Sequence, residues 1–185
     1  MLQSTLLEIG KELLLVLFVV LGVASPFTMP APSQAPAERT SSATATSTLY
    51  AVLKVVDGDT ISIDMNGKKE TVRLIGINTP ETVDPRRPVE CFGKEASNKA
   101  REILTGKRVR IETDASQSDR DKYGRLLGYV IREDGLFFNK YMIAEGYAYE
   151  YTYHVPYMYQ REFKEAQRSA QANEKGLWAP GVCAK

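Results

Sequence analysis

Residues 55–81, VVDGDTISIDMNGKKETVRLIGINTPE, contain the pattern that decides the fold. Asp57-Gly58 and Asn66-Gly67 are turn dipeptides, and apolar and polar residues alternate between them as in a half-buried strand. Because Asn-Gly suits a two-residue hairpin loop with positive φ, we expect a strand through 60–64 to pair with a strand through 71–77. This hairpin gathers a set of polar side chains: Asp59, Arg73, Asn78, Thr79 and Glu81.

The rest of the folded region alternates short strands with amphipathic helices. The patterns predict strands near 50–56, 108–113 and 126–131, a turn at 121–124, and helices over 95–104, 139–145 and 159–172. Asn139 is the expected cap of the second helix, and Gly176 is expected to end the third. Because most strands lack crossover helices between them, we expect a β-rich α+β class: a five-stranded OB-fold Greek-key barrel with three helices.

The N-terminal region differs in composition from the rest of the 185 residues. Residues 13–24 are an unbroken apolar run of signal-peptide length, so residues 1–24 are expected to be a cleavable signal or, because Glu8 and Glu12 outweigh Lys11, an uncleaved membrane anchor. Residues 25–48 are rich in Pro, Ala, Ser and Thr and read as a disordered linker. The organisation predicted is a folded domain over 49–180, a tail over 181–185, and a location outside the cytoplasm, secreted or anchored to the outer face of the membrane.

The charge balance limits the way in which the domain can bind nucleic acid. Without residues 1–24, the chain has 23 Lys and Arg against 21 Asp and Glu. Bulk attraction to phosphate is therefore excluded, and any phosphate must be held by a local cluster of basic side chains. The single histidine, His154, excludes mechanisms that need two imidazoles and zinc sites built on several His and Cys ligands.

Hard oxygen donors flank the predicted hairpin. Asp59, the Asn78 amide and a backbone carbonyl near Thr79 suit calcium, which accepts carboxylate, amide and carbonyl oxygens. With one formal charge the site would be weak, with a dissociation constant of about 10⁻⁴ to 10⁻³ M. The alternative is that Asp59 and Asn78 only form turns.

Two arginines and a glutamate complete a candidate phosphate site. Arg73 points away from the face of its apolar neighbours, and the guanidinium needs an anion, either a phosphate or a carboxylate such as Glu70. Glu81 follows Pro80 and would deprotonate a water from the rim, unless it is only a surface glutamate. Arg125 supplies a second guanidinium. Together the two guanidinium groups would stabilise the negative charge of a transition state with five-coordinate phosphorus.

The motifs VVDGDT, RLIGINTPE and DKYGR, in this order and with GLW near the end, resemble the staphylococcal nuclease-like (thermonuclease) family. The resemblance covers roughly residues 50–180. It implies a calcium-dependent phosphodiesterase that cuts DNA and RNA to products ending in 3′-phosphate, with single strands expected to be preferred. No obligate protein partner is evident, and residues 13–24 would serve as a membrane tether if they are retained.

The resemblance also assigns roles to residues. Asp59 matches the calcium-binding aspartate, and Thr79 matches the residue that offers a carbonyl to the metal. Arg73, Glu81 and Arg125 match the catalytic arginine, glutamate and second arginine. The positions matching contacts to the terminal phosphate and the nucleotide are Lys122, Tyr123 and Tyr151.

Asn78 departs from the family pattern, because the best-known members have an aspartate there. An amide oxygen still binds calcium, but the affinity is expected to be lower. We therefore expect Asn78→Asp to reduce the calcium requirement.

The segment 146–159 is rich in tyrosine, GYAYEYTYHVPYMY. Aromatic rings beside a basic groove stack on bases and bind single strands without sequence preference. We expect Tyr151 and Tyr153 to lie nearer the site and the other tyrosines to be structural.

Cys91 and Cys183 are the only cysteines. An even count in an exported chain suggests a disulfide, and the alternative is a pair of free thiols too distant to meet.

Two other functions remain open beside an exported calcium nuclease. One is a catalytically weak OB-fold module that binds nucleic acid, and the other is a membrane-tethered domain that binds a protein through its tyrosines. The presence of Arg73, Glu81 and Arg125 together favours the nuclease.

Overall fold

The computed structural model describes residues 48–82, 84–86 and 88–183. The predicted leader (1–24) and nearly all of the predicted linker (25–48) lie outside the described residues. Within the described ranges, no helix has both the length and the apolar character needed to cross a membrane.

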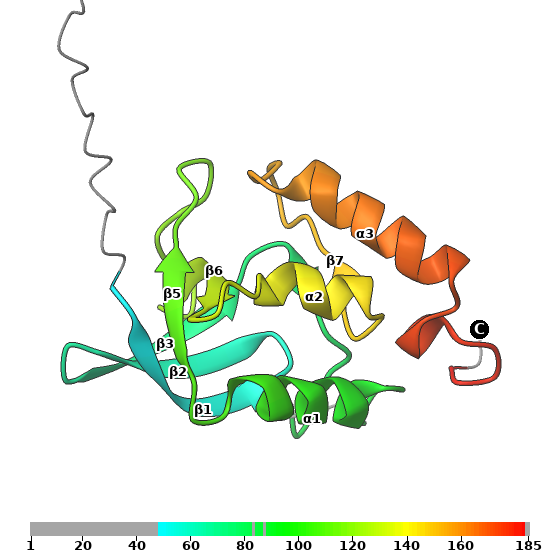
Figure 1. The fold of residues 1–185 in the computed structure, drawn as a ribbon, viewed down its shortest axis with the longest axis horizontal. Helices are drawn as coiled ribbons and strands as arrows, with labels where there is room; N and C mark the ends of the chain where they lie inside the picture. The colour runs from blue at the N-terminus through cyan, green and yellow to red at the C-terminus, as the bar shows by residue number, and fades with distance from the viewer. Residues whose placement is uncertain (1–47, 83, 87, 184–185) are drawn as a thin grey trace, which may run out of the picture. The chain divides into compact units, whose positions relative to one another are not determined.

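Five strands close into a barrel in the order β1-β2-β3-β6-β5 (Figure 1). Their bounds are β1 Tyr50–Asp57, β2 Thr60–Met65, β3 Lys68–Leu74, β5 Arg108–Glu112 and β6 Leu126–Arg132. Neighbours are antiparallel except β3 and β6, which pair in parallel. With three α-helices added, this confirms the predicted β-rich α+β barrel of OB type.

The β2–β3 hairpin turns where the sequence predicts. Met65 pairs with Lys68, and the two loop residues have positive φ, 59° at Asn66 and 81° at Gly67. These are the backbone angles of the loop type that Asn-Gly favours. The register places Arg73 opposite Thr60, so the guanidinium begins at the same end of the barrel as the β1–β2 turn.

The strand predicted to continue to residue 77 stops earlier, at Leu74. Gly76 has φ +79°, and a Cβ there would lie 2.6 Å from the ring of Tyr157, so both the backbone conformation and the space require glycine. The chain bends and forms a separate short strand, β4 (Ile77–Asn78), which pairs with β7 (Tyr149–Glu150). This bend brings Asn78 beside the tyrosine-rich segment.

Three helices pack around the barrel and one another: α1 Gly93–Leu104, α2 Phe138–Ala144 and α3 Gln160–Ala172. In Figure 1, α2 lies between the barrel strands and α3. The third helix ends at Ala172, and Gly176 instead begins a 3₁₀ turn, η1 Gly176–Trp178.

Asn139 does not cap α2, so that prediction was wrong. The cap position is Phe137, and Asn139 lies inside the first turn, fully buried. Its side-chain oxygen accepts the N–H of Val130 at 2.9 Å, and its amide donates to the carbonyl of Ile75 at 2.9 Å. The side chain satisfies two buried backbone groups at once, a tertiary role that outweighs the local preference of asparagine for a cap.

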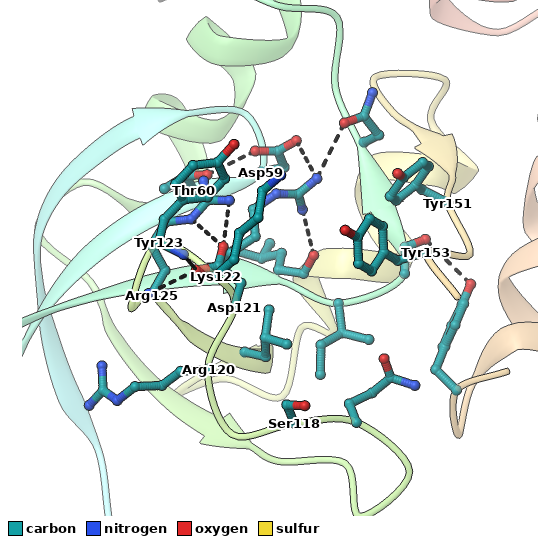
Figure 2. A pocket seen from close by; sticks show the side chains of 18 of the residues that line it. Asp59, Thr60, Ser118, Arg120, Asp121, Lys122, Tyr123, Arg125, Tyr151 and Tyr153 are labelled. Carbon is teal, nitrogen blue, oxygen red and sulfur yellow. Dashed lines mark hydrogen bonds and ion pairs between the residues drawn. The ribbon is translucent and has the colours of Figure 1, made fainter. Parts of the chain in front are cut away.

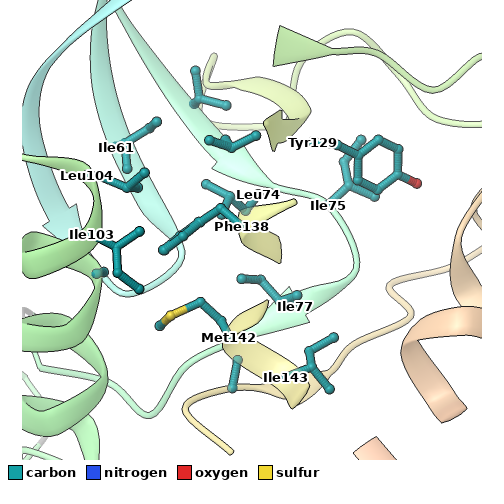
Figure 3. Packing of buried hydrophobic residues seen from close by; sticks show 14 of the residues in the cluster. Ile61, Leu74, Ile75, Ile77, Ile103, Leu104, Tyr129, Phe138, Met142 and Ile143 are labelled. Atoms are coloured by element: carbon teal, nitrogen blue, oxygen red, sulfur yellow. The ribbon is translucent and has the colours of Figure 1, made fainter. Parts of the chain in front are cut away.

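The hydrophobic core joins the barrel to α1 and α2. Figure 3 shows Ile61 and Leu74 of the barrel with Leu104 of α1 and with Phe138 and Met142 of α2. All five are fully or almost fully buried. Burial of each such side chain stabilises the fold by about 1.5 to 3 kcal/mol. The core therefore holds α1 and α2 against the barrel, and the polar residues project from the end of the barrel that carries the β1–β2 turn.

Candidate functional site

One cleft of about 740 Å³ opens at this end of the barrel. All nine predicted catalytic, metal and substrate residues line it: Asp59, Arg73, Asn78, Thr79, Glu81, Lys122, Tyr123, Arg125 and Tyr151. They come from β3, β4 and four loops, so folding collects residues that lie between positions 59 and 151 of the chain. The two cysteines lie outside the lining and are bonded to each other as a disulfide.

Arg73 is fixed at the bottom of the cleft. Its side chain is 14% exposed, and Nη1 donates to the carbonyls of Leu74 at 2.6 Å and Ile77 at 2.9 Å. The other nitrogen, Nη2, lies 3.2 Å from Oδ1 of Asn78 and 3.1 Å from Oδ2 of Asp59. The carboxylate partner of Arg73 is therefore Asp59. Hydrogen bonds to carbonyls of the bend after β3 hold the guanidinium in one orientation.

Glu70, the other carboxylate considered for Arg73, has different partners. It pairs with Arg120 and Lys68, each at 2.9 Å, and the hydrogen bond from Arg120, with that from Lys68, lowers the pKa of Glu70 to about 2. Arg120 also donates to the carbonyl of Gly124 at 2.7 Å. Arg120 thus connects the turn at 121–124 to β3, a role that its sequence context does not reveal.

The candidate metal donors meet beside Arg73. Oδ2 of Asp59 accepts the backbone N–H of Thr79 at 3.1 Å, and Oδ1 accepts the hydroxyl of Thr60 at 2.9 Å. Oxygens of Asp59 and Asn78 both approach the same nitrogen of Arg73, so the two donors converge on one small volume. The hairpin and the bend at Gly76 together produce this convergence.

Asp57 is a site residue that the sequence reading assigned only to a turn. It lines the cleft, is buried, and accepts hydrogen bonds from the hydroxyl of Thr82 at 2.8 Å and from the N–H of Gly58 at 2.9 Å. Burial, with the nearby charges of Asp59 and Glu81, raises its pKa despite those hydrogen bonds. The repeated acid in Asp-Gly-Asp was the signal available in the sequence.

Glu81 lies where the chain leaves β4 on its way to α1. Its Oε1 accepts the N–H of Asp84 at 3.1 Å, and its own N–H donates to Oε2 of Glu90 at 3.0 Å. Glu81 and Glu90 both line the cleft. The carboxylate that the sequence proposes as a base is therefore held at the edge of the same space as Arg73.

The turn at 121–124 forms the side of the cleft that carries Lys122, Tyr123 and Arg125. Gly124 donates its N–H to the carbonyl of Asp121 at 2.9 Å, which confirms the predicted turn. Arg125, whose side chain is 30% exposed, binds the Asp121 carboxylate at 2.6 Å and lies 5.3 Å from the centre of the Tyr123 ring. Burial alone would raise the pKa of Asp121, but hydrogen bonds from Arg125 and Tyr123 outweigh it and lower the pKa. The guanidinium of Arg125 is thus already paired with the carboxylate of Asp121.

Aromatic side chains stand on both sides of the cleft. Figure 2 shows Lys122 and Tyr123 on one side and Tyr151 and Tyr153 on the other, with Asp59 between the two groups. Tyr123 is 72% exposed and Tyr153 is 60% exposed. His154, which the sequence left without a role, also lines the cleft, with its ring centroid 3.9 Å from that of Tyr153.

The tyrosines divide between the cleft and the interior. Tyr157 also borders the cleft but is buried, and its hydroxyl donates to Glu150 at 3.1 Å. Tyr147 packs against Phe92, with ring centroids 5.6 Å apart. The exposed rings of Tyr151 and Tyr153 remain available for contact with a base.

The donor set fits a hard cation that prefers oxygen. It offers one carboxylate, one amide oxygen and one carbonyl, and the carboxylates of Asp57 and Glu81 line the same cleft. Among the described residues there is no group of three or more His, Cys, Asp or Glu side chains arranged to hold a metal. Oxygen donors of these types are ones that a hard cation accepts, whereas softer metals prefer nitrogen or sulfur.

Comparison with known proteins shows the protein family to which the chain belongs. Residues 71–180 match the family described as staphylococcal nuclease homologue. The thermonuclease of Staphylococcus hyicus is 42% identical over 130 residues, 70% of this chain and 75% of the relative. The thermonuclease of Staphylococcus intermedius is 45% identical over 129 residues, with the same shares. Endonuclease YncB of Bacillus subtilis is 35% identical over 127 residues, 68% of this chain and 59% of the relative.

Proposed function

Since the chain belongs to the staphylococcal nuclease family, we propose that it is a nuclease that hydrolyses phosphodiester bonds of DNA and RNA with the help of calcium. The observation that carries the proposal is the meeting of Asp59, Arg73 and Asn78 at the floor of one cleft that Glu81 and Arg125 also line. Relatives named thermonuclease and endonuclease support it.

Arg73 is the residue best placed to hold the scissile phosphate. Its guanidinium is oriented by two backbone carbonyls, so it does not need to reorganise when charge grows on the phosphoryl oxygens. A phosphate oxygen entering the floor would take the place now occupied by the Asp59 carboxylate on Nη2. A planar fork with paired donors matches phosphate geometry, which a lysine does not.

Glu81 acts as the general base. It accepts a proton from a water that attacks phosphorus, while the bond from phosphorus to the 5′-oxygen breaks and that oxygen takes up a proton. The phosphate stays on the 3′-oxygen of the upstream nucleotide, so the products end in 3′-phosphate. Arg125 would turn from Asp121 toward the phosphate and stabilise the charge on the departing oxygen.

Asp59, Asn78 and the carbonyl of Thr79 would hold calcium beside Arg73. When bound, the cation supplies positive charge that stabilises the phosphoryl oxygens and orients water. Asp59 contributes the only formal charge among these donors, and we expect an affinity in the range of about 10⁻⁴ to 10⁻³ M, which suits an extracellular protein.

Single strands are the preferred substrate in this proposal. The exposed rings of Tyr123, Tyr151 and Tyr153 stand on both sides of the floor, where they can stack on unpaired bases. Lys122 adds a positive charge beside Tyr123, with Nζ 5.0 Å from the ring centre. Stacking tolerates any base, so low sequence preference follows.

The decisive experiment incubates the purified domain with single-stranded DNA and with RNA, in calcium or in chelator. We expect cleavage only with calcium, 3′-phosphate ends on the products, and its loss in Glu81→Gln. Binding without cleavage by the wild-type domain would replace the proposal with a catalytically weak nucleic-acid-binding module. Absence of both binding and cleavage would leave a domain that binds a protein through its tyrosines.

We also propose that the nuclease works outside the cytoplasm, either secreted or tethered by residues 1–24. The apolar run at 13–24 and the disulfide between Cys91 and Cys183 support an oxidising compartment. N-terminal sequencing of material collected from the medium and from the membrane fraction tests this. A mature N-terminus after residue 24 indicates secretion, and an intact leader in the membrane fraction indicates a tether.

A further inference from the structure

Glu81 and Glu90 hold each other through two hydrogen bonds. The N–H of Glu81 donates to the Oε2 of Glu90 at 3.0 Å, and the N–H of Glu90 donates to the carbonyl of Glu81 at 2.9 Å. These bonds join the two ends of the segment between them. We call this pair of contacts the clasp.

The clasp lies in a long connection. Between β4, which ends at Asn78, and α1, which begins at Gly93, the described residues form no helix or strand. The position of a backbone in such a loop depends on individual contacts, because no ladder of hydrogen bonds fixes it. The position of the Glu81 backbone therefore depends on the clasp and on the residues that pack against the loop.

The start of α1 packs directly on this backbone. A Cβ at Gly93 would lie 2.7 Å from Cγ2 of Thr82, 3.0 Å from the carbonyl oxygen of Pro80 and 3.2 Å from that of Glu81, so a side chain there would crowd this backbone. The N–H of Gly93 donates to the carbonyl of Glu90 at 3.1 Å. Glu81, Glu90 and the first residue of α1 thus form one compact unit at the edge of the cleft.

A covalent bond anchors the same unit from the other side. Cys91, next to Glu90, is bonded to Cys183, which is 92 residues further along the chain and follows η1. The disulfide ties the end of the clasp to the C-terminal segment. Cys91 is exposed, so a reductant in solution can reach it.

We propose that Glu90 and the Cys91–Cys183 disulfide position Glu81 for catalysis and make full activity depend on oxidation of the two cysteines. Glu90 is a positioning residue, because its carboxylate accepts the backbone N–H of Glu81. The inference rests on the proposed function, because it assigns to Glu81 the role of general base. A misplacement of about 1 Å in a catalytic group can cost about 10²-fold in rate, so even partial release of the clasp would be measurable.

Reduction would act on the unit without removing any side chain of the cleft. A dithiol such as dithiothreitol supplies two electrons and two protons, the sulfur–sulfur bond breaks, two thiols form, and the reagent closes to its cyclic disulfide. Glu90 then remains next to a free Cys91, and the covalent anchor of the clasp is lost.

The test compares three variants in the same assay with single-stranded DNA. Glu90→Leu removes the acceptor, Glu90→Gln keeps an oxygen that accepts the N–H of Glu81, and Glu95→Leu alters an exposed glutamate of α1 as the matched control. We expect Glu90→Leu to lower kcat about tenfold or more with KM changed less than about twofold, because the displaced group acts on turnover rather than binding. Glu90→Gln should keep most of the turnover, and Glu95→Leu should match the wild type.

The disulfide is tested by Cys91→Ser/Cys183→Ser and by the wild type in dithiothreitol, at a temperature where each remains folded by circular dichroism. Both should show a lower kcat with KM nearly unchanged, and dithiothreitol should have no further effect on the double variant. Equal kcat in oxidised and reduced protein would overturn the redox dependence.

Hydrogen exchange at the Glu81 amide, followed by NMR, tests the clasp without relying on cleavage. We expect exchange at least about tenfold faster in Glu90→Leu and in the reduced protein, and near wild-type exchange in Glu90→Gln, because a lost hydrogen bond exposes the amide. Unchanged exchange in Glu90→Leu would overturn the positioning role. A wild type that shows this exchange pattern but cleaves nothing would refute the proposed function alone.

Discussion

On the floor of the cleft, Arg73 is 14% exposed and makes hydrogen bonds to two backbone carbonyls, whereas on the rim Tyr123 is 72% exposed. The floor consists of Asp59, Arg73, Asn78 and Thr79. The rim consists of Lys122, Tyr123, Tyr151 and Tyr153. Both groups line the same cleft, yet the floor includes Arg73 of the barrel strand β3 and Asn78 of the short strand β4, whereas all four rim residues lie in loops.

The difference indicates a division of labour. Groups that stabilise a transition state must be oriented before the reaction, and a buried network with backbone acceptors achieves this. Groups that accept many different bases gain from exposed rings on loops, because stacking requires no particular partner. The floor should therefore control turnover, and the rim should control binding.

Substitution of Arg73 on the floor is expected to have the largest effect and tests the difference between floor and rim. We expect Arg73→Lys to lower kcat about 10²- to 10³-fold, because an ammonium lacks the planar fork that meets the phosphate and its backbone acceptors. KM should change little. Steady-state cleavage of single-stranded DNA measures this, with the melting temperature as a check on folding. A large rise in KM with kcat preserved would place Arg73 in binding rather than catalysis.

Packing beside the cleft is tested at Asp114, a buried carboxylate whose partner Ser116 lines the cleft. Asp114 accepts the Tyr129 hydroxyl at 2.6 Å and the N–H of Met158 at 2.7 Å, as well as the N–H and hydroxyl of Ser116. We expect Asp114→Asn to lower the free energy of unfolding by about 2 kcal/mol, because an amide cannot accept all of these bonds. Urea denaturation measures the loss. Asp134→Asn, at an exposed pair with Arg132, is the control and should cost far less.

The same carboxylate predicts a pH dependence. Burial opposes the charged form, but hydrogen bonds from Met158, Tyr129 and Ser116 outweigh it and lower the pKa of Asp114 below its usual range. A lowered folded-state pKa means that this stabilisation is complete above the unfolded value of about 3.9 and is lost as the pH falls below it. Urea denaturation between about pH 5 and pH 3 should therefore show a steeper loss of stability in the wild type than in Asp114→Asn. Equal slopes would contradict the assignment.

At the floor, Asn78→Asp adds a second carboxylate where two oxygens already converge. We expect the calcium concentration for half-maximal cleavage to fall roughly tenfold, since affinity rises with the charge of the ligands. Calcium titration by calorimetry gives a measurement independent of activity. An unchanged or higher requirement would count against Asn78 as a ligand.

The smallest effect is expected at the rim. Tyr123→Ala should raise KM by a factor corresponding to about 1 kcal/mol, the lower end of the stacking range, because the ring is largely exposed. kcat should stay within about twofold of the wild type, because the ring touches no reacting atom. Tyr123→Phe keeps the ring and should behave like the wild type. If Tyr123→Ala instead lowered kcat as strongly as Arg73→Lys, the division between floor and rim would fail.

Much of the barrel was predictable because its signals are local. The Asn66-Gly67 turn, the strand at β2 and the apolar stripe of α1 depend on residues a few positions apart. The alternation in β2 predicted a half-buried strand, which was wrong, because the barrel and its helices bury both faces from Thr60 to Ile63. The predictions that were wrong concern contacts between distant residues. Gly76 bends the chain around the ring of Tyr157, and Asn139 bonds to Ile75 and Val130 instead of capping its helix.

The candidate site divides in the same way. Motif spacing indicated which residues belong together, and all nine line one cleft. It did not indicate that Asp59 is the partner of Arg73, that Arg120 braces the turn at 121–124, or that Asp57 belongs to the site. These three contacts depend on strand register, burial and the direction of side chains, and no pattern within a few residues of the sequence encodes them.

The amino-acid sequence by itself determined the five strands of the barrel, the three α-helices and the types of residue available for chemistry, because turn propensity and apolar periodicity act over a few residues. Only the tertiary structure decided which carboxylate faces which guanidinium, which rings are exposed, and that Glu90 and a disulfide hold the segment that carries Glu81. The physical reason is that hydrogen bonds and ion pairs act over about 3 Å in space, and only the closed barrel brings such distant residues within that range.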